Sequence, residues 1–190
     1  PYSNKKGMLL KYEILNRALS SFDSDSVFIM PDPKGTLFDA NYAKKLSNEQ
    51  KIVFISPAFE GVDERIFSSF PIQKISMGDF ILFNGDCPSL MMAEAAIRYL
   101  PNVIGCSDCV DDDSILSGLL EAPQYTTPQS IDQMGVPEVL LSGNHREIAR
   151  WKYKKSLSRT LFSRPDLLNG FKFDPELVKM IDQVVTEDVE

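Results

Sequence analysis

Residues 26–55 read SVFIMPDPKGTLFDANYAKKLSNEQKIVFI, with a short apolar run at either end. The first run, Ser26–Met30, and the second, Ile52–Ile55, are followed by Pro and Gly residues, which is typical of strands buried in a parallel sheet. Between them, Asp39–Leu46 fits a crossover helix. A strand, a crossover helix and a second strand predict an α/β fold with a mostly parallel sheet.

The flanking segments continue this alternation. A helix is expected over Tyr12–Phe22, because its apolar residues recur at helical spacing. Ile75–Phe83 predicts a further short strand or an ordered loop, and Pro88–Leu100 predicts a helix with Pro at its first position and Asp86 as its cap. The apolar stripe of the first of these helices consists of Ile14, Leu15, Ala18 and Phe22.

The C-terminal part of the chain has a helical pattern. Asn144, with Glu147 three residues later, predicts a capped helix that runs through Leu157. Asp174, followed by Pro, predicts the start of a final helix with Leu177, Ile181 and Val184 on one side. We therefore expect an α/β domain over residues 1–105, a flexible acidic linker over 106–117 and a small helical domain over 118–190.

Positive charge is concentrated in one segment of an otherwise acidic chain. Residues 144–164 carry seven Lys or Arg and one Glu, whereas the formal net charge of the whole chain is −7. A basic, aromatic-containing segment of this kind indicates a surface that binds RNA or DNA. The alternative is a solvated helix flank, which many charge runs are.

Composition excludes several other classes of protein. No run approaches the ~20 apolar residues of a membrane span. The three cysteines are few and odd in number, which argues against a disulfide framework. We expect a soluble protein of the reducing cytoplasm, with no membrane partner. The spacing of Cys106 and Cys109 resembles half of a zinc site, but the single histidine and Cys87 leave too few further ligands, so no metal site is expected.

Five segments, taken in order, resemble one enzyme family. They are FEGVDER (Phe59–Arg65), SMGDFILFNGD (Ser76–Asp86), DSILSGLLEAPQYTTP (Asp113–Pro128), VPEVLLSGNH (Val136–His145) and SLSRTLFSRPDLL (Ser156–Leu168). Together they are similar to the bacterial tRNA (guanine-N(1))-methyltransferases of the TrmD family, which act at position 37 of tRNA. The resemblance implies a SPOUT-type fold with a deep trefoil knot, and a homodimer with each active site built across the interface.

The resemblance also implies where S-adenosylmethionine, the methyl donor, binds. It lies in the loops of the knot, and small residues such as Gly78 let the backbone approach its adenine. Glu60 and Glu121 match acidic residues near its methionine end, and the family suggests a magnesium requirement. The matching positions are Ser56, Pro57, Glu60, Met77, Gly78, Asp79, Phe80, Ile81, Leu82, Asn84, Gly85 and Glu121.

Two residues match the catalytic pair of the family. Guanine's ring nitrogen is a poor nucleophile until its proton leaves, and Asp113 matches the general base that removes this proton. Arg98 matches the arginine that stabilises the negative charge developing on the guanine oxygen. Without the resemblance, Asp113 would be a linker residue and Arg98 a cation complementing a helix dipole.

The basic segment would then hold the tRNA. Its lysines and arginines should contact phosphates, while Ser142, Asn144 and His145 are better placed by their chemistry for contacts near the target base. Trp151 is expected in the core, because Ile148 shares its helix face. The expected tRNA-binding residues are Ser142, Asn144, His145, Arg146, Arg150, Lys154, Arg159 and Arg164.

The chain departs from the family pattern at several places. Pro57-Ala58 replaces a Gly-Arg, Asn84 replaces a Gly, and Asp32-Pro33-Lys34-Gly35 replaces a Ser-Pro-Gln-Gly turn. The chain also begins inside what the family has as a glycine-rich loop. Two other functions stay open: a knotted methyltransferase acting on another RNA, and a non-catalytic RNA-binding relative. DNA is not an expected partner of the family.

Overall fold

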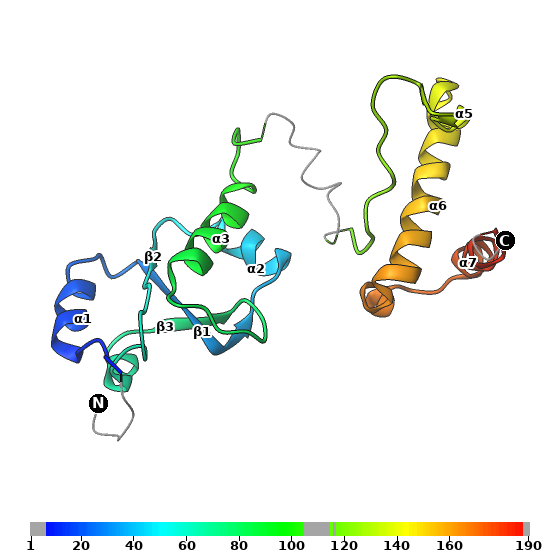
Figure 1. Ribbon diagram of the computed structural model, residues 1–190. Coiled ribbons are helices and arrows are strands. Elements are labelled where there is room, and N and C mark those ends of the chain that lie inside the picture. The colour runs from blue at the N-terminus through cyan, green and yellow to red at the C-terminus, as the bar shows by residue number, and fades with distance from the viewer. Residues whose placement is uncertain (1–6, 105–114, 116, 188–190) are drawn as a thin grey trace. The chain divides into compact units, whose positions relative to one another are not determined.

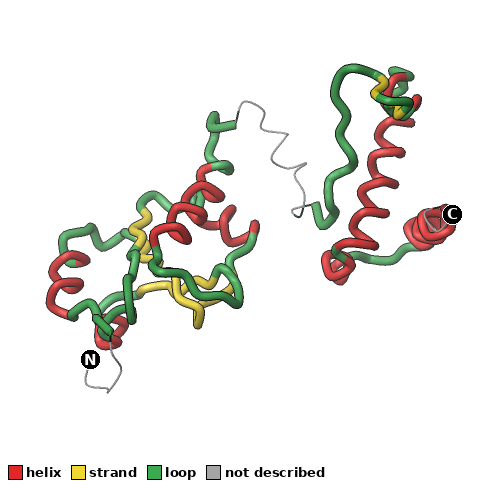
Figure 2. The backbone as a smooth tube through the Cα atoms, in the orientation of Figure 1, coloured by secondary structure: helices red, strands yellow, loops and turns green. Residues whose placement is uncertain are grey.

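A computed structural model describes residues 7–104, 115 and 117–187. The chain separates into two compact units, residues 1–106 and 107–190. Figure 1 labels the α-helices of both units and the strands of the first, and Figure 2 shows that the strands belong mainly to the first. None of the helices in the described ranges is long and apolar enough to cross a membrane. Most of the expected linker, residues 106–117, lies outside the described residues, so its extent stays a prediction.

The first unit contains the parallel sheet that the apolar runs predict. Strands β1 (Val27–Leu37), β2 (Ile52–Phe54) and β3 (Ile72–Ser76) lie in the order β2-β1-β3, and both pairings are parallel. The crossover helix α2 (Ala40–Leu46) joins β1 to β2 and begins where the Asp39 carboxylate accepts the Tyr42 N–H at 2.7 Å. The α/β fold and its parallel sheet are thus confirmed.

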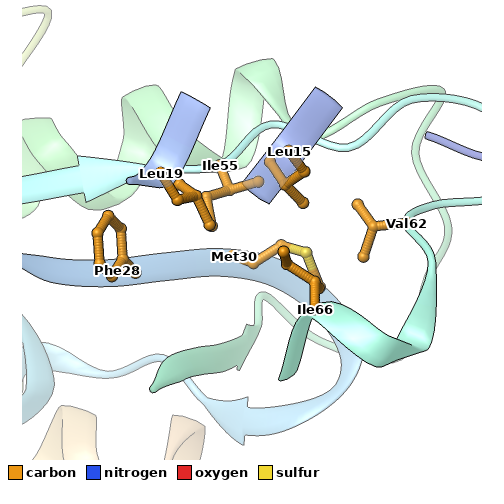
Figure 3. Close-up of a cluster of buried hydrophobic side chains, with 7 residues drawn as sticks. All are labelled: Leu15, Leu19, Phe28, Met30, Ile55, Val62 and Ile66. Carbon is orange, nitrogen blue, oxygen red and sulfur yellow. The ribbon is translucent and has the colours of Figure 1, made fainter. Parts of the chain in front are cut away.

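Both faces of this sheet are covered. On one face, helix α1 (Tyr12–Leu19) and the 3-10 helix η1 (Glu64–Ser68) pack against Phe28 and Met30 of β1. Figure 3 shows their side chains converging on β1. On the other face, α2 and helix α3 (Asp86–Ile97) pack against Ile29 and Ile75. Alternate residues of β1 therefore serve opposite cores, as the two-residue period of a strand requires.

Two expectations about element position are wrong, those for the first helix and for the start of α3. The stripe of α1 that faces the core consists of Leu15 and Leu19, and the helix ends before Phe22, which is about half exposed. The segment Ile75–Phe83, expected as a short strand or an ordered loop, contains the end of β3 (Ile72–Ser76) and is a loop beyond it. Helix α3 starts at Asp86, so Asp86 is not its cap. The Asp86 carboxylate instead accepts from Asn84 Nδ2 at 2.8 Å and from Ser56 Oγ.

Strand β1 contains an irregularity that only glycine permits. Pro31 and Thr36 both pair with Ile75, so residues 32–35 loop out of the ladder as a bulge. A Cβ at Gly35 would lie 2.3 Å from the carbonyl carbon and oxygen of Lys74. Because both contacts are backbone atoms of the neighbouring strand, they cannot move without separating β1 from β3.

Gly35→Ala is therefore expected to destabilise the first unit by about 2–4 kcal/mol. Urea unfolding followed by far-UV circular dichroism measures this, since the only tryptophan, Trp151, reports on the second unit. Gly135→Ala is the matched control, because a Cβ there meets nothing within 4 Å. Equal stability of the two variants would contradict the close approach at Gly35.

The second unit is mainly helical in its described part. A hairpin of β4 (Ser130–Ile131) and β5 (Met134–Gly135) leads into the short helix α5 (Glu138–Leu141). The long helix α6 (His145–Ser163), the 3-10 helix η2 (Pro165–Gly170) and helix α7 (Pro175–Glu187) follow. Its buried core consists of Leu119, Leu157, Leu168 and Leu177.

The predicted helix starts of this unit are confirmed. The Asn144 side chain accepts the Glu147 N–H at 3.4 Å, and Asp174 Oδ1 accepts the Leu177 N–H at 2.8 Å. The reciprocal half of the capping box does not form at Asn144, because its own N–H donates to Ser142 Oγ at 3.1 Å. Val184 is buried on α7 as expected.

Candidate active site

A cavity of about 510 Å³ opens at the carboxyl ends of the parallel strands in the first unit. Its walls come from the bulge of β1, from the loop that follows β2 and from the loop that follows β3. Ligand sites of open α/β sheets lie at this edge, where loops from neighbouring strands meet. The position of the cavity therefore follows from the parallel pairing of the strands.

Two of these loops are joined directly to each other. The Gly85 N–H donates to the Pro57 carbonyl at 2.8 Å, and Ala58 and Asn84 form an antiparallel bridge. Gly85 is buried, and a Cβ on it would lie 2.6 Å from Pro57 Cδ. A residue without a side chain is thus required where the two loops cross.

The loop after β3 places backbone and apolar groups at the cavity. Gly78 has φ +133°, a conformation that favours glycine, and its N–H donates to Ser76 Oγ at 3.2 Å. Beyond it, Phe80, Ile81, Leu82 and Phe83 line the cavity while remaining largely exposed. The result is an apolar wall beside a tight turn, which suits a flat aromatic ligand.

Another part of the lining carries carboxylates. Asp32, Glu60 and Glu64 all line the cavity. Lys74 Nζ lies 3.2 Å from Glu64 Oε1, 4.0 Å from Asp32 Oδ2 and 3.5 Å from the ring centroid of Phe67. This ammonium partly offsets two of the acids, whereas Glu60 forms no ion pair within the described part of the chain. This part of the lining is therefore suited to a cationic group of a ligand.

Nearby, Asp63 is not available to a ligand. Its carboxylate accepts two hydrogen bonds from the Arg65 side chain, at 2.9 and 2.6 Å, and also the Arg65 backbone N–H. The side-chain hydrogen bonds hold the pKa of Asp63 at about 2. Asp63 is consequently charged, paired and engaged in starting η1.

Most residues expected to hold the methyl donor lie around this cavity. Ser56 does not line it and instead donates to Asp86, and Asp79 lies outside the lining. Glu121 belongs to the second unit, where its Oε1 accepts from Gln124 Nε2 at 2.5 Å. The nine that line the cavity are Pro57, Glu60, Met77, Gly78, Phe80, Ile81, Leu82, Asn84 and Gly85.

Sequence reasoning missed the contribution of the bulge. Asp32, Pro33 and Lys34 line the cavity together with Phe59 and Glu64. The available signal was a Pro- and Gly-containing turn directly after a buried strand, which often marks a loop at a ligand site. Because this turn departs from the family pattern, the resemblance does not point to it.

Neither of the two expected catalytic residues is among the described residues that line the cavity. Asp113 lies outside the described residues. Arg98 is exposed and follows the last residue of α3, whereas Gly85 and Pro88 at the other end of this helix line the cavity. Ten residues of helix separate Pro88 from Arg98, or about 15 Å. Arg98 therefore does not line the cavity of its own chain.

The expected tRNA-binding residues divide into two groups. His145, Arg146 and Arg150 are exposed near the start of α6 and form no ion pair within the described ranges. Lys154 is partly buried and has an interaction partner. Free cations near the helix start are suited to phosphate contacts.

The second group stabilises the unit itself. Arg159 Nη1 donates to the Glu121 carbonyl at 3.2 Å. Arg164 donates to both carboxylate oxygens of Asp166, from Nε at 2.8 Å and from Nη2 at 2.6 Å. These hydrogen bonds lower the pKa of Asp166. Ser142 Oγ donates to the Val139 carbonyl at 2.7 Å, and Asn144 caps α6. These residues have structural partners that a tRNA contact would have to share.

Comparison with known proteins gives one consistent result. The family described as "tRNA (Guanine-1)-methyltransferase TrmD" matches residues 1–170. A protein of Lacticaseibacillus paracasei is 42% identical over 192 residues, covering 99% of this chain and 75% of the relative. One of Streptococcus agalactiae is 39% identical over 188 residues (98% and 75%), and one of Dictyoglomus turgidum 37% over 188 residues (98% and 76%). All three relatives bear the name tRNA (guanine-N(1)-)-methyltransferase.

Proposed function

This chain belongs to the tRNA (guanine-1)-methyltransferase family, and from that premise we propose that it methylates guanosine 37 of tRNA with S-adenosylmethionine as donor. The enzyme class and the tRNA substrate follow from the family and the names of the relatives. The observation that carries the proposal in the structure is the cavity at the strand ends, with its two joined loops. We assign the trefoil knot of the family to this part of the first unit.

The donor fits the cavity by its chemistry. The apolar wall of Phe80, Ile81 and Leu82 suits adenine, and Gly78, which has no side chain, lets adenine approach the backbone of the turn. Glu60 offers a carboxylate to the donor's ammonium. When bound, S-adenosylmethionine supplies a methyl group made electrophilic by the positive charge on sulfur.

Two protein groups then act on the guanine. Asp113 accepts the proton of the ring nitrogen, which frees its lone pair for attack on the methyl carbon. Arg98 stabilises the negative charge that this leaves on the guanine oxygen. Because Arg98 lies at the end of α3 away from its own cavity, it acts in the active site of a second copy of the chain.

Helix α3 supports such a homodimer. Leu90, Met91 and Ile97 are 70%, 55% and 46% exposed, although Met92 and Ala96 on the other side of the helix are buried. A helix that is apolar on both sides normally has both sides covered. Arg98 directly follows the exposed stripe, so covering this stripe with a second copy brings Arg98 to the interface.

The start of α6 holds the tRNA. The free cations Arg146 and Arg150 supply contacts to phosphates, which give affinity and salt dependence but no sequence preference. His145, exposed at the first turn, remains available for a contact near the target base.

The test is methyl transfer from labelled S-adenosylmethionine to unmodified tRNA with guanosine at position 37, beside the same tRNA with adenosine there. Both reactions are run with and without magnesium. Incorporation into the guanosine tRNA alone is expected. Incorporation into other RNAs in a panel would favour a related knotted methyltransferase, and failure to bind the donor would favour a non-catalytic RNA-binding protein.

Gly85→Val is expected to weaken donor binding by at least about tenfold, because even its Cβ would lie 2.6 Å from Pro57 Cδ and force the two loops apart. Calorimetric titration with S-adenosylhomocysteine measures the change in Kd. Gly135→Ala, which introduces no close contact, should bind as the wild type does. Unchanged donor affinity in a folded Gly85→Val protein would show that the two joined loops do not form the donor site.

A further inference from the structure

A second cavity, of about 580 Å³, lies within the second unit and has no role in the function proposed so far. It is an open depression lined by the segment 123–129, by Val136 and the end of α5, and by one side of α6. Its lining consists of Pro123, Gln124, Tyr125, Thr126, Thr127, Gln129, Val136, Leu140, Leu141, Ile148 and Lys152.

The lining combines three kinds of group. Val136, Leu140 and Ile148 form an apolar floor. The Tyr125 ring is 48% exposed and lies 6.4 Å from the Trp151 ring at 50°, which fixes its orientation. The amide and hydroxyl side chains of the lining come from the same segment as this ring; they are Gln124, Thr126, Thr127 and Gln129. An aromatic face, an apolar floor and several donors and acceptors are what a nucleobase requires of its site.

Charge at the rim also favours a nucleotide. Lys152 lines the cavity, is exposed, and forms no ion pair with any described residue. It lies two residues after Arg150, and successive helical residues differ by about 100° around the axis. Lys152 and Ile148 therefore face roughly away from Arg146 and Arg150, so α6 presents free cations on two sides.

The segment that forms the cavity is anchored before any ligand binds. The Leu120 N–H donates to Thr160 Oγ1 at 2.8 Å, and Arg159 Nη1 donates to the Glu121 carbonyl at 3.2 Å. At its other end, the Val136 N–H donates to the Gln129 carbonyl at 2.9 Å. A site held at both ends loses little freedom when it is occupied, which favours binding.

We infer that this cavity receives one unpaired base of the tRNA, other than the guanine that is methylated, by stacking it on Tyr125 while Lys152 contacts the adjoining phosphate. The inference rests on the proposed function, since it takes the partner to be tRNA. It adds a second recognition site to that function, one that detects an unstacked nucleotide outside the reacting centre.

The experiment measures tRNA affinity for a panel of tRNAs, each with one abasic nucleotide in a loop other than at position 37. Wild type, Tyr125→Leu and Tyr153→Leu are compared on this panel. Tyr153 is the matched control, because it is an exposed tyrosine of α6 that does not line the cavity. Circular dichroism and melting of each variant establish that it is folded.

One abasic position is expected to weaken wild-type binding by about 5- to 150-fold, the range for one base stacked on an aromatic side chain. Tyr125→Leu should cause a similar loss with intact tRNA and no further loss with that abasic tRNA. Tyr153→Leu should bind every tRNA as the wild type does.

Two results would overturn the inference: intact affinity in folded Tyr125→Leu, or losses that add at every abasic position. If Tyr125→Leu is unfolded, Tyr125→Met, whose longer side chain fills more of the space of the ring, replaces it in the same panel and must show the same non-additivity. Methylation of intact tRNA by the wild type is recorded in parallel. If the wild type does not methylate intact tRNA, the proposed function is wrong. If it does, but the losses of affinity add at every abasic position, only the assignment of a base to this cavity is wrong.

Discussion

Asp113→Asn is expected to lower kcat for methyl transfer by about 10²–10⁴-fold, the usual contribution of a positioned general base. The amide of asparagine has the size of the carboxyl group but cannot accept the ring proton of guanine. The neutral guanine nitrogen then has no free lone pair for the methyl carbon. Single-turnover methylation of guanosine 37 tRNA, with saturating donor and tRNA, measures the chemical step directly.

Asp112→Asn is the matched control, because it makes the same change in the same acidic run, one residue earlier. It should retain kcat, and both variants should bind S-adenosylhomocysteine as the wild type does. A loss of catalysis that is equal in both variants would indicate that the charge of the run matters rather than a specific base. Wild-type kcat in Asp113→Asn would exclude Asp113 as the base.

Local patterns predicted the sheet but not its details. The apolar runs at 26–30 and 52–55, with a helix between them, correctly gave two parallel strands. Neither the length of β1 nor the place of β3 could be found in this way. The bulge at Asp32–Gly35 depends on the approach of Gly35 to the backbone of Lys74, a contact between residues distant in the sequence.

The site shows the same limit. The hydrogen bond from Gly85 to Pro57 joins two loops that are 28 positions apart in the chain, and no periodicity relates them. The resemblance to a family pointed to both loops, because it carries three-dimensional information that one sequence lacks. It did not point to Asp32 or Lys34, where this chain departs from the family pattern.

Arg98→Ala is expected to lower kcat by about 10²–10³-fold, the usual loss on removing one stabilising donor at a developing oxyanion. Donor affinity should not change, because Arg98 does not line the donor cavity of its own chain. Arg17→Ala is the matched control: Arg17 is likewise an exposed cation at a helix end, in the last turn of α1. If Arg98 only complemented the dipole of α3, both variants would lose only a little stability and neither would lose catalysis.

Mixed dimers then decide in which active site Arg98 acts. A dimer of one Arg98→Ala chain and one Gly85→Val chain, isolated through two different tags, contains one intact donor cavity and one intact Arg98 on different chains. If Arg98 serves the partner's cavity, one of the two sites is complete and the mixed dimer should recover about half of the wild-type activity. If Arg98 serves its own cavity, neither site is complete and the mixed dimer should be as inactive as its parents. The comparison is made at a donor concentration near the wild-type Kd, where both parental dimers are strongly impaired, one in catalysis and the other in donor binding. Recovery can then come only from a site built by both chains.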